Sequence, residues 1–284
     1  MSVGDDFLIS SEIQEKTQID YSAVPNISPE NVVSLFSFAL PADRVNVDGQ
    51  VFVDQDGDLI VRRRSDAVEV IAIEHSRATP LGLVGQQVWR GALLLADFLL
   101  HQGCALAGHT LLELGAGVGL TSIVAAMFSR EVICTDVDRG GILELMRGNA
   151  ARNADLLKAR VTVLGLDFFS MGRWSPTLAA KLPVVDVVLA ADVIYDNDVT
   201  EAFVDTLVEL LRLPPTKTVY IALEKRYVFT VADLDCCAPC YEFFVQCLSQ
   251  AVPPGWTCEQ LPLDFPQYFR YDRVKELVLW RLTS

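Results

Sequence analysis

The chain has 284 residues, of which 37 are acidic and 23 basic, so its formal net charge is −14. Hydrophobic residues make up 51% and charged residues 21%, a balance that can bury a sizeable core and excludes wholesale disorder. The acidic excess argues against sequence-independent nucleic-acid binding, which needs clustered Lys and Arg to neutralise phosphates. Residues 1–75 carry 14 acids and 5 bases, so most of the excess lies there and suits a basic partner or simple solubility.

The cysteines and the N-terminus indicate where the protein works. Seven cysteines are an odd number spread over a long chain, and residues 1–10 do not resemble a signal peptide. The apolar runs are too short for a membrane-spanning helix. We therefore expect a reduced, intracellular protein, nuclear and/or cytoplasmic, without a membrane partner.

The N-terminal part has two predicted regions. Residues 1–30 are polar and aperiodic, which predicts a flexible tail. An Asp-Gly turn signal and alternating apolar residues then predict a small antiparallel β-module over residues 31–84, built from the segments Val45–Val53, Leu59–Arg63 and Val68–Ile73.

Residues 85–284 predict one larger α/β domain. Helical spacing predicts helices over Gly85–Leu100, Leu120–Phe128, Gly141–Asn153, Val199–Leu211 and Tyr241–Gln250. Short apolar runs predict strands at Thr110–Leu114, Glu131–Thr135, Val161–Leu164, Asp186–Ala190, Thr218–Leu223, Thr257–Leu261 and Lys275–Leu282. This alternation indicates a doubly wound, mostly parallel seven-stranded sheet, Rossmann-like in class. The last two strands have no helix between them and should be antiparallel.

A glycine-rich loop follows the first strand of this domain. Glu113-Leu-Gly115-Ala116-Gly117-Val-Gly119 opens the next helix, where glycines let the backbone approach a ligand closely. The glycine spacing of 0, 2 and 4 departs from the 0, 2 and 5 of a dinucleotide fingerprint. Glu113 at the strand end suits a cationic ligand better than a pyrophosphate. A purely structural turn is the alternative.

Two further acids follow the next strands. Asp136, 21 residues after Gly115, ends its strand where a carboxylate can accept both hydroxyls of a ribose. The alternative for Asp136 is a helix N-cap. Asp167 and Phe168 follow the third strand and could read an adenine through its amine and its face. Their alternative is a turn residue beside a core phenylalanine.

These residues resemble the seven-strand class I methyltransferases, which use S-adenosylmethionine, over residues 85–284. Ala190-Ala191-Asp192-Val-Ile-Tyr195 resembles the Asp-x-x-Tyr motif of a family of protein lysine methyltransferases, in which a Trp before the glycine loop also touches the cofactor. Glu224–Arg226 and Phe265–Gln267 point to one particular member. The resemblance implies catalytic roles for Asp192 and Tyr195 and cofactor binding by Trp89, Glu113, Gly115, Ala116, Gly117, Gly119, Asp136, Asp167, Phe168 and Ala191.

The resemblance implies a protein N-lysine methyltransferase. A lysine is neutral in only about one molecule in 2,500 at pH 7, so burial and positioning must supply the nucleophile. Asp192 could orient the amine, and Tyr195 could wall the channel with a face that tolerates a cation. We expect a monomer and a protein substrate with its lysine in a basic region, and no direct nucleic-acid partner. The alternative is a catalytically silent adaptor that binds S-adenosylmethionine and recruits a basic protein.

Three other patterns have simpler interpretations. Asp192, Asp196 and Asp198 could hold a divalent ion but fit a loop and helix cap better, so no metal is predicted. Cys236-Cys-Ala-Pro-Cys240 could be redox-active or bind zinc, although small buried thiols are the ordinary case. Asn149 and Asn153, four residues apart on one helix, are interpreted as polar surface.

Overall fold

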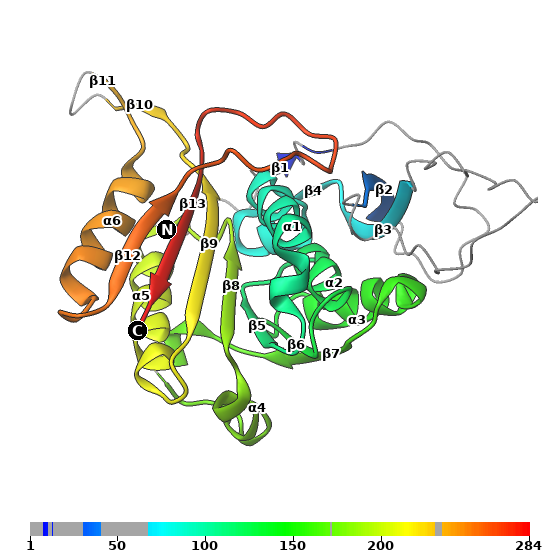
Figure 1. Ribbon diagram of the computed structural model, residues 1–284. Coiled ribbons are helices and arrows are strands. Elements are labelled where there is room, and N and C mark those ends of the chain that lie inside the picture. The colour runs from blue at the N-terminus through cyan, green and yellow to red at the C-terminus, as the bar shows by residue number, and fades with distance from the viewer. Residues whose placement is uncertain (1–7, 11–12, 14–30, 41–67, 171, 231–234) are drawn as a thin grey trace, which may run out of the picture.

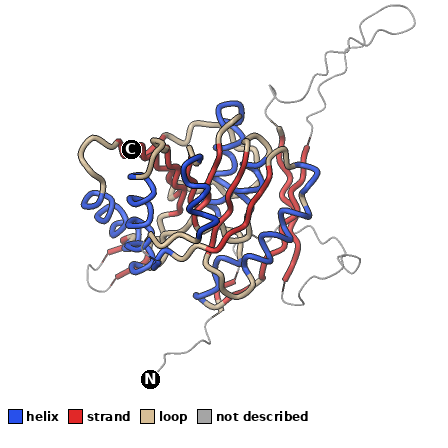
Figure 2. Tube along the Cα trace, turned by 90° about the horizontal axis from the view of Figure 1, so that it is seen from below, coloured by secondary structure: helices blue, strands red, loops and turns tan. Residues whose placement is uncertain are grey.

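A seven-stranded sheet with helices on both faces forms the centre of the molecule (Figures 1 and 2). The computed structural model describes residues 8–10, 13, 31–40, 68–170, 172–230 and 235–284. In spatial order the strands are β12 (Thr257–Leu261), β13 (Leu277–Thr283), β9 (Thr218–Glu224), β8 (Val187–Ala191), β5 (Thr110–Leu114), β6 (Glu131–Asp136) and β7 (Arg160–Gly165). The predicted doubly wound fold is confirmed.

The strand directions follow from the connections between strands. Neighbours among β5 to β9 are parallel, and helical crossovers join them along the chain. Every residue of β5 is buried, as expected for a strand covered on both faces. The strand β13 runs antiparallel to β9, and β12 runs antiparallel to β13. The absence of a helix between these last two strands therefore predicted their pairing correctly.

The α-helices lie on both sides of the sheet (Figure 1). One side carries α1 (Arg90–Gln102), α2 (Leu120–Ala126) and α3 (Ile142–Arg152), and the other carries α4 (Pro176–Lys181), α5 (Asn197–Arg212) and α6 (Pro239–Ala251). Two large apolar clusters fill these two layers. None of the helices in the described ranges is long and apolar enough to cross a membrane.

The helix predicted over Gly85–Leu100 begins later than expected. Leu81–Gln86 form a 3-10 helix (η2), and α1 starts at Arg90 after an extended Trp89. Pro80 precedes η2, and two glycines within it weaken a regular helix, which explains the difference. The residues before Arg90 are consequently free to form a wall beside the glycine-rich loop.

A small antiparallel pair, β2 (Asn31–Ala39) and β3 (Val68–Ser76), packs against α3 through β3 and shares the apolar cluster of α1 and α2. The strand β3 confirms and extends the predicted strand at Val68–Ile73, whereas β2 was not predicted. The hairpin predicted at Val45–Val53 and Leu59–Arg63 lies outside the described residues. Two short pairs complete the strands: β1 (Ile9–Ser10) with β4 (Ala78–Thr79), and β10 (Val228–Thr230) with β11 (Asp235–Cys237).

Asn149 and Asn153 of α3 are buried, so their interpretation as polar surface is wrong. The Asn153 amide accepts the N–H of Ala72 and donates to its C=O, both at 2.9 Å. The Asn149 amide does the same for Glu74, at 2.7 and 2.9 Å, and also donates to Val118 O at 2.9 Å. These are the bonds that a neighbouring strand would make to β3. The two side chains therefore fasten β3 to α3.

Replacing Asn149 with alanine is expected to lower the free energy of unfolding by about 2–4 kcal/mol, because buried backbone groups of Glu74 and Val118 lose their partners. Urea unfolding followed by circular dichroism measures this loss. The control is Glu144→Ala on the exposed face of the same helix, with an expected change within about 0.5 kcal/mol. Equal stability of the two variants would contradict the fastening role.

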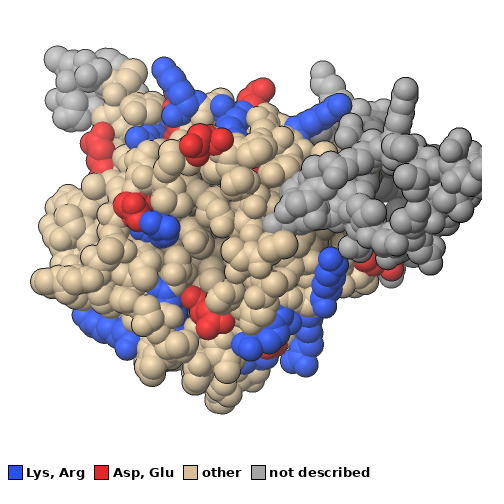
Figure 3. Space-filling model, in the orientation of Figure 1, with Lys and Arg blue, Asp and Glu red and all other residues tan. Residues whose placement is uncertain are grey.

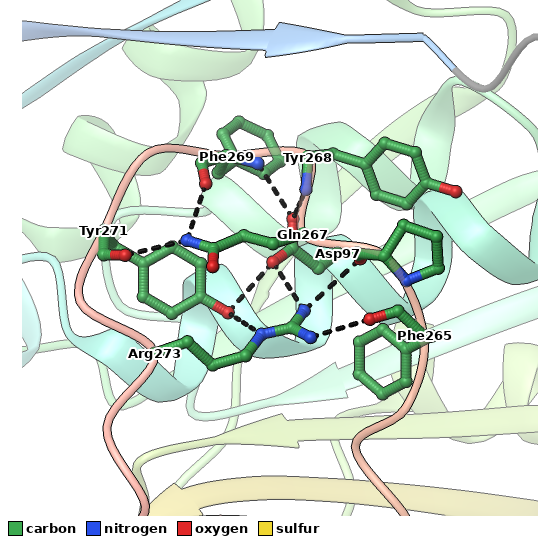
Figure 4. A network of polar contacts seen from close by, with 8 residues as sticks. Asp97, Phe265, Gln267, Tyr268, Phe269, Tyr271 and Arg273 are labelled. Atoms are coloured by element: carbon green, nitrogen blue, oxygen red, sulfur yellow. Dashed lines mark hydrogen bonds and ion pairs between the residues drawn. The ribbon is translucent and has the colours of Figure 1, made fainter.

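One buried carboxylate, that of Asp97 on α1, holds the connection between β12 and β13 (Figure 4). Its Oδ1 accepts the backbone N–H groups of Tyr268 and Phe269 at 2.8 and 2.9 Å. Its Oδ2 accepts the Tyr271 hydroxyl and Arg273 Nη2, both at 2.9 Å. A charge this deeply buried is tolerated because each oxygen has partners. The last connection of the sheet is thereby fixed to the first helix.

Candidate functional site

A cavity of about 420 Å³ opens at the carboxyl ends of the parallel strands, between the glycine-rich loop and η2. Open α/β sheets bind their ligands at this edge, where the strand order reverses, and the volume suits a small molecule. The lining includes all the residues predicted for the site except Gly119: Trp89, Glu113, Gly115, Ala116, Gly117, Asp136, Asp167, Phe168, Ala191, Asp192 and Tyr195. The sequence-based selection therefore converges on one place.

The glycine-rich loop has no room for side chains at two positions. Gly115 and Gly117 have φ values of +64° and +57°, which L side chains rarely adopt. A Cβ on Gly117 would lie 2.7 Å from the carbonyl oxygen of Gly85, and one on Gly115 would lie 2.6 Å from Val193 Cγ1. Gly119 instead begins α2 in a left-handed conformation. The first two glycines shape the cavity, and the third shapes the helix.

Asp136 is anchored to the loop on which the cavity depends. Its Oδ2 accepts the Gly117 N–H at 2.8 Å, and its Oδ1 accepts the Val137 N–H at 2.7 Å. Burial raises the pKa of this carboxyl, and the two N–H groups oppose that rise. An ionised carboxylate has about four acceptor sites, so the geometry leaves capacity for a ligand's hydroxyl groups. The helix-cap alternative is not what is observed, because Gly141 precedes α3.

Glu113 lies at the floor of the cavity and is only 1% exposed. It accepts a hydrogen bond from the Ser122 hydroxyl of α2. Burial raises its pKa to about 8, in spite of that hydrogen bond. A cation bound in the cavity would favour the ionised form of this group.

Asp167 and Phe168 enter the cavity from the turn after β7. Asp167 Oδ1 accepts the N–H of Phe169 at 3.0 Å, so this residue does form a turn as well as line the cavity. The ring of Phe168 packs edge-on against Phe203 of α5, with centroids 5.5 Å apart. Phe169 also lines the cavity and is 56% exposed, although the sequence did not single it out.

Asp192 has an unusual backbone conformation, and each oxygen of its carboxylate accepts one backbone N–H. Its φ of +50° lies in the left-handed region. Its Oδ2 accepts the Gly91 N–H at 2.5 Å, and its Oδ1 accepts the Glu224 N–H at 3.0 Å. Burial raises its pKa to about 6, and Arg226 is the first of the groups that oppose this rise. Asp192 thus joins the ends of β8 and β9 to the start of α1.

Tyr195 is the more exposed of the two predicted catalytic residues, with 39% of its surface accessible to solvent. It follows Asp192 on the loop between β8 and α5 and lines the cavity. The next residue, Asp196, accepts the Val199 N–H at 3.0 Å and caps α5, as the sequence predicted for this acidic cluster. No group of His, Cys, Asp and Glu in the described ranges is arranged to hold a metal ion.

Apart from Trp89, the wall opposite the glycine-rich loop was missed by sequence reasoning. It consists of η2 and the residues up to Trp89, whose Nε1 donates to Val84 O at 2.9 Å. Gly85 touches the loop through its carbonyl oxygen, and Leu81 is 56% exposed at the rim. Pro80 with two nearby glycines was the available signal that this stretch is not a plain helix.

The cavity is strongly acidic. Six carboxylates line it, and Arg139 is the cation among its described lining residues; the carboxylates belong to Glu113, Asp136, Asp167, Asp192, Asp196 and Asp198. On the face seen in Figure 3, by contrast, Lys and Arg lie scattered among Asp and Glu. Such a cavity favours a positively charged ligand.

Comparison with known proteins gives consistent results. A family model described as lysine methyltransferase matches residues 69–234. Methyltransferase-like protein 22, the member that Glu224–Arg226 pointed to, is 36% identical in Mus musculus, over 84% of this chain and 66% of that protein. The Homo sapiens protein is 38% identical over 76% of this chain and 58% of that protein. The protein-lysine N-methyltransferase EEF2KMT of Mus musculus is 30% identical over 71% of this chain and 58% of that protein. The chain thus spans between 58% and 66% of the length of these relatives.

Proposed function

Because the chain belongs to the lysine methyltransferase family, we propose that it transfers a methyl group from S-adenosylmethionine to the side-chain amine of a lysine in a protein. The observation that carries this proposal is the acidic cavity at the carboxyl edge of the sheet. It suits the sulfonium of the cofactor and a lysine that arrives as an ammonium, which must lose its proton before the amine accepts the methyl group. Relatives named as protein-lysine N-methyltransferases support the choice of acceptor.

The residues present fit the cofactor. Gly115 and Gly117 line the cavity without side chains, and a Cβ on either would collide with Val193 or Gly85, so the backbone itself can face a ligand there. Asp136 retains acceptor sites for ribose hydroxyls, and the Phe168 ring can cover an adenine. Glu113 would face the positive part of the ligand. When bound, S-adenosylmethionine supplies an electrophilic methyl group.

The chain's own residues would then position the acceptor amine. Tyr195 lies at the exposed side of the cavity, where its ring can wall a lysine side chain. Asp192 has about two acceptor sites beyond those used by Gly91 and Glu224, so it can orient the amine while it holds α1. Positioning of this kind is the main contribution that a methyl transfer requires.

The substrate is proposed to present its lysine in a basic segment, because the carboxylates of the cavity include the outer residues Asp196 and Asp198. We further propose that the protein acts as a monomer inside the cell, in the nucleus and/or cytoplasm. Cys104, Cys134, Cys240, Cys247 and Cys258 form no disulfide in the structure, which suits a reducing compartment.

The test is transfer of a radiolabelled methyl group from S-adenosylmethionine to proteins of a cell extract, with the modified residue identified by mass spectrometry. Wild-type protein should label a band on lysine, and Tyr195→Ala should label it much less. Binding of S-adenosylhomocysteine without any label would favour the silent adaptor. Failure to bind it would exclude both functions.

Glu113 predicts a pH dependence of cofactor affinity. Its pKa of about 8 means that it is largely protonated at pH 7, whereas a bound cation favours the ionised form. Binding should therefore release a proton, and affinity should rise between about pH 7 and 8, by at most about tenfold per pH unit. Calorimetry in buffers of different ionisation enthalpy measures the proton release.

Glu113→Gln should remove this part of the pH dependence, and Glu144→Gln on exposed α3 should retain it. An unchanged slope in Glu113→Gln would show that another group releases the proton.

A further inference from the structure

Three consecutive residues at the start of α1 are each held by a residue from the end of β8 or β9. The Arg226 guanidinium lies over the Trp89 ring, 4.6 Å from its centroid. Arg90 Nη1 lies 3.1 Å from Glu224 Oε2. The third contact is the hydrogen bond from Gly91 to Asp192. We call Trp89–Gly91 and these three partners the α1 latch.

The α1 latch controls one wall of the cavity. Trp89 lines the cavity, and its indole N–H holds Val84 of η2, which lines it as well. Arg226 is not among the lining residues, so it acts on the cavity through the Trp89 ring. A displaced ring would release η2 from the glycine-rich loop, where Gly85 O is packed against Gly117. The latch is thus connected, through Trp89 and Val84, to the wall that η2 forms.

Arg226 also acts electrostatically on Asp192, the latch residue that follows β8. Arg226 favours the ionised form of Asp192, and Glu224 opposes it. Glu224 is in turn paired with Arg90 of α1. Gly91 from α1 and Glu224 from β9 donate their backbone N–H groups to the carboxylate. Removal of the Arg226 charge should consequently raise the pKa of Asp192 and weaken its hold on α1.

We propose that Arg226 is a positioning residue for the cofactor, which holds Trp89 against η2 and keeps Asp192 bound to the first turn of α1. This inference rests on the proposed function, since it assigns to the cavity the cofactor named there. It also extends that function to a residue outside the cavity. Cation–π contacts of this kind are worth enough to change affinity by about tenfold.

The experiment compares Arg226→Gln with Lys225→Gln. The neighbouring Lys225 points its ammonium at Tyr241 of α6, 4.4 Å from the ring centroid, so the control removes the same charge without touching the latch. S-adenosylhomocysteine is the probe, and its dissociation constant is measured by calorimetry between pH 5 and 8. Hydrogen exchange of residues 84–93 is measured without any ligand.

Arg226→Gln should weaken binding about tenfold at pH 8. Its loss of affinity toward acid pH should begin at a higher pH than in the wild type, and residues 84–93 should exchange faster. Lys225→Gln should match the wild type in all three measurements, and Arg226→Lys should be intermediate because it retains the charge without the planar stack.

Wild-type affinity, pH profile and exchange in Arg226→Gln would overturn the inference and leave the proposed function standing. A wild type that fails to bind the probe would instead contradict the proposed function. Faster exchange with unchanged affinity would show a purely structural contact and would also overturn the positioning role.

Discussion

Gly117→Ala is expected to abolish binding of S-adenosylmethionine and its demethylated product, and with it methyl transfer. The added Cβ would lie 2.7 Å from Gly85 O, at a φ of +57° that alanine adopts only at a cost. To relieve this contact the loop must move away from η2, and the Gly117 N–H then loses Asp136. We expect affinity to fall by at least about 100-fold, because a displacement of about 1 Å can cost this much.

The matched control is Gly148→Ala. Gly148 lies inside α3, and a Cβ there would have nothing within 4 Å. This variant should unfold at a higher denaturant concentration, with a gain of about 0.5–1 kcal/mol, and bind as the wild type does. Calorimetry with S-adenosylhomocysteine checks both proteins, and circular dichroism verifies their folding. Near-native affinity in Gly117→Ala would mean that the ligand does not sit against this loop.

Asp192→Asn is expected to lower the rate of methyl transfer by at least about 100-fold, through the position of α1 and of the acceptor amine. Asparagine tolerates the left-handed backbone at this position, so the loop itself should keep its shape. Its amide offers one acceptor where the carboxylate serves both Gly91 and Glu224. Asp192→Ala should additionally lower stability by about 2–4 kcal/mol, because two buried N–H groups lose their partner.

The same residue predicts an acid limb in the pH–rate profile. Its pKa is raised to about 6, so the carboxylate is ionised above that pH and becomes protonated as the pH falls through it. Activity should therefore fall below about pH 6. The control is Asp205→Asn, which removes a charge from the exposed face of α5, outside the cavity. If that variant loses as much activity as Asp192→Asn, the effect is one of overall charge rather than of the latch.

Local patterns predicted the central sheet because its strands are short apolar runs separated by amphipathic helices. The residues of β5 and the cap of α5 at Asp196 could be found from neighbours in the sequence. The strand β2 could not, because what defines it is its pairing with residues of β3 that lie 29 to 45 positions further along. The burial of Asn149 likewise depends on a partner that lies 75 residues earlier.

The candidate site shows the same division between local and distant information. Glycines and acids that follow strands are local signals, and they located the cavity. Which atoms the Asp192 carboxylate binds was not predictable, because Gly91 lies 101 residues before it. The contact of Arg226 with Trp89 is likewise set only when β9 reaches the start of α1.

Asp97 has a consequence for the order in which the chain becomes stable during synthesis. Its partners lie 171 to 176 residues further along, on the connection that leads to the last strand. As a ribosome releases the chain, α1 emerges long before those donors, and a buried carboxylate without them is costly. The helix can therefore dock fully only when synthesis has passed Arg273. Nascent chains arrested before that point should remain sensitive to protease at α1. The Asp97 carboxylate therefore delays full docking of α1 until the connection between β12 and β13 has been synthesised.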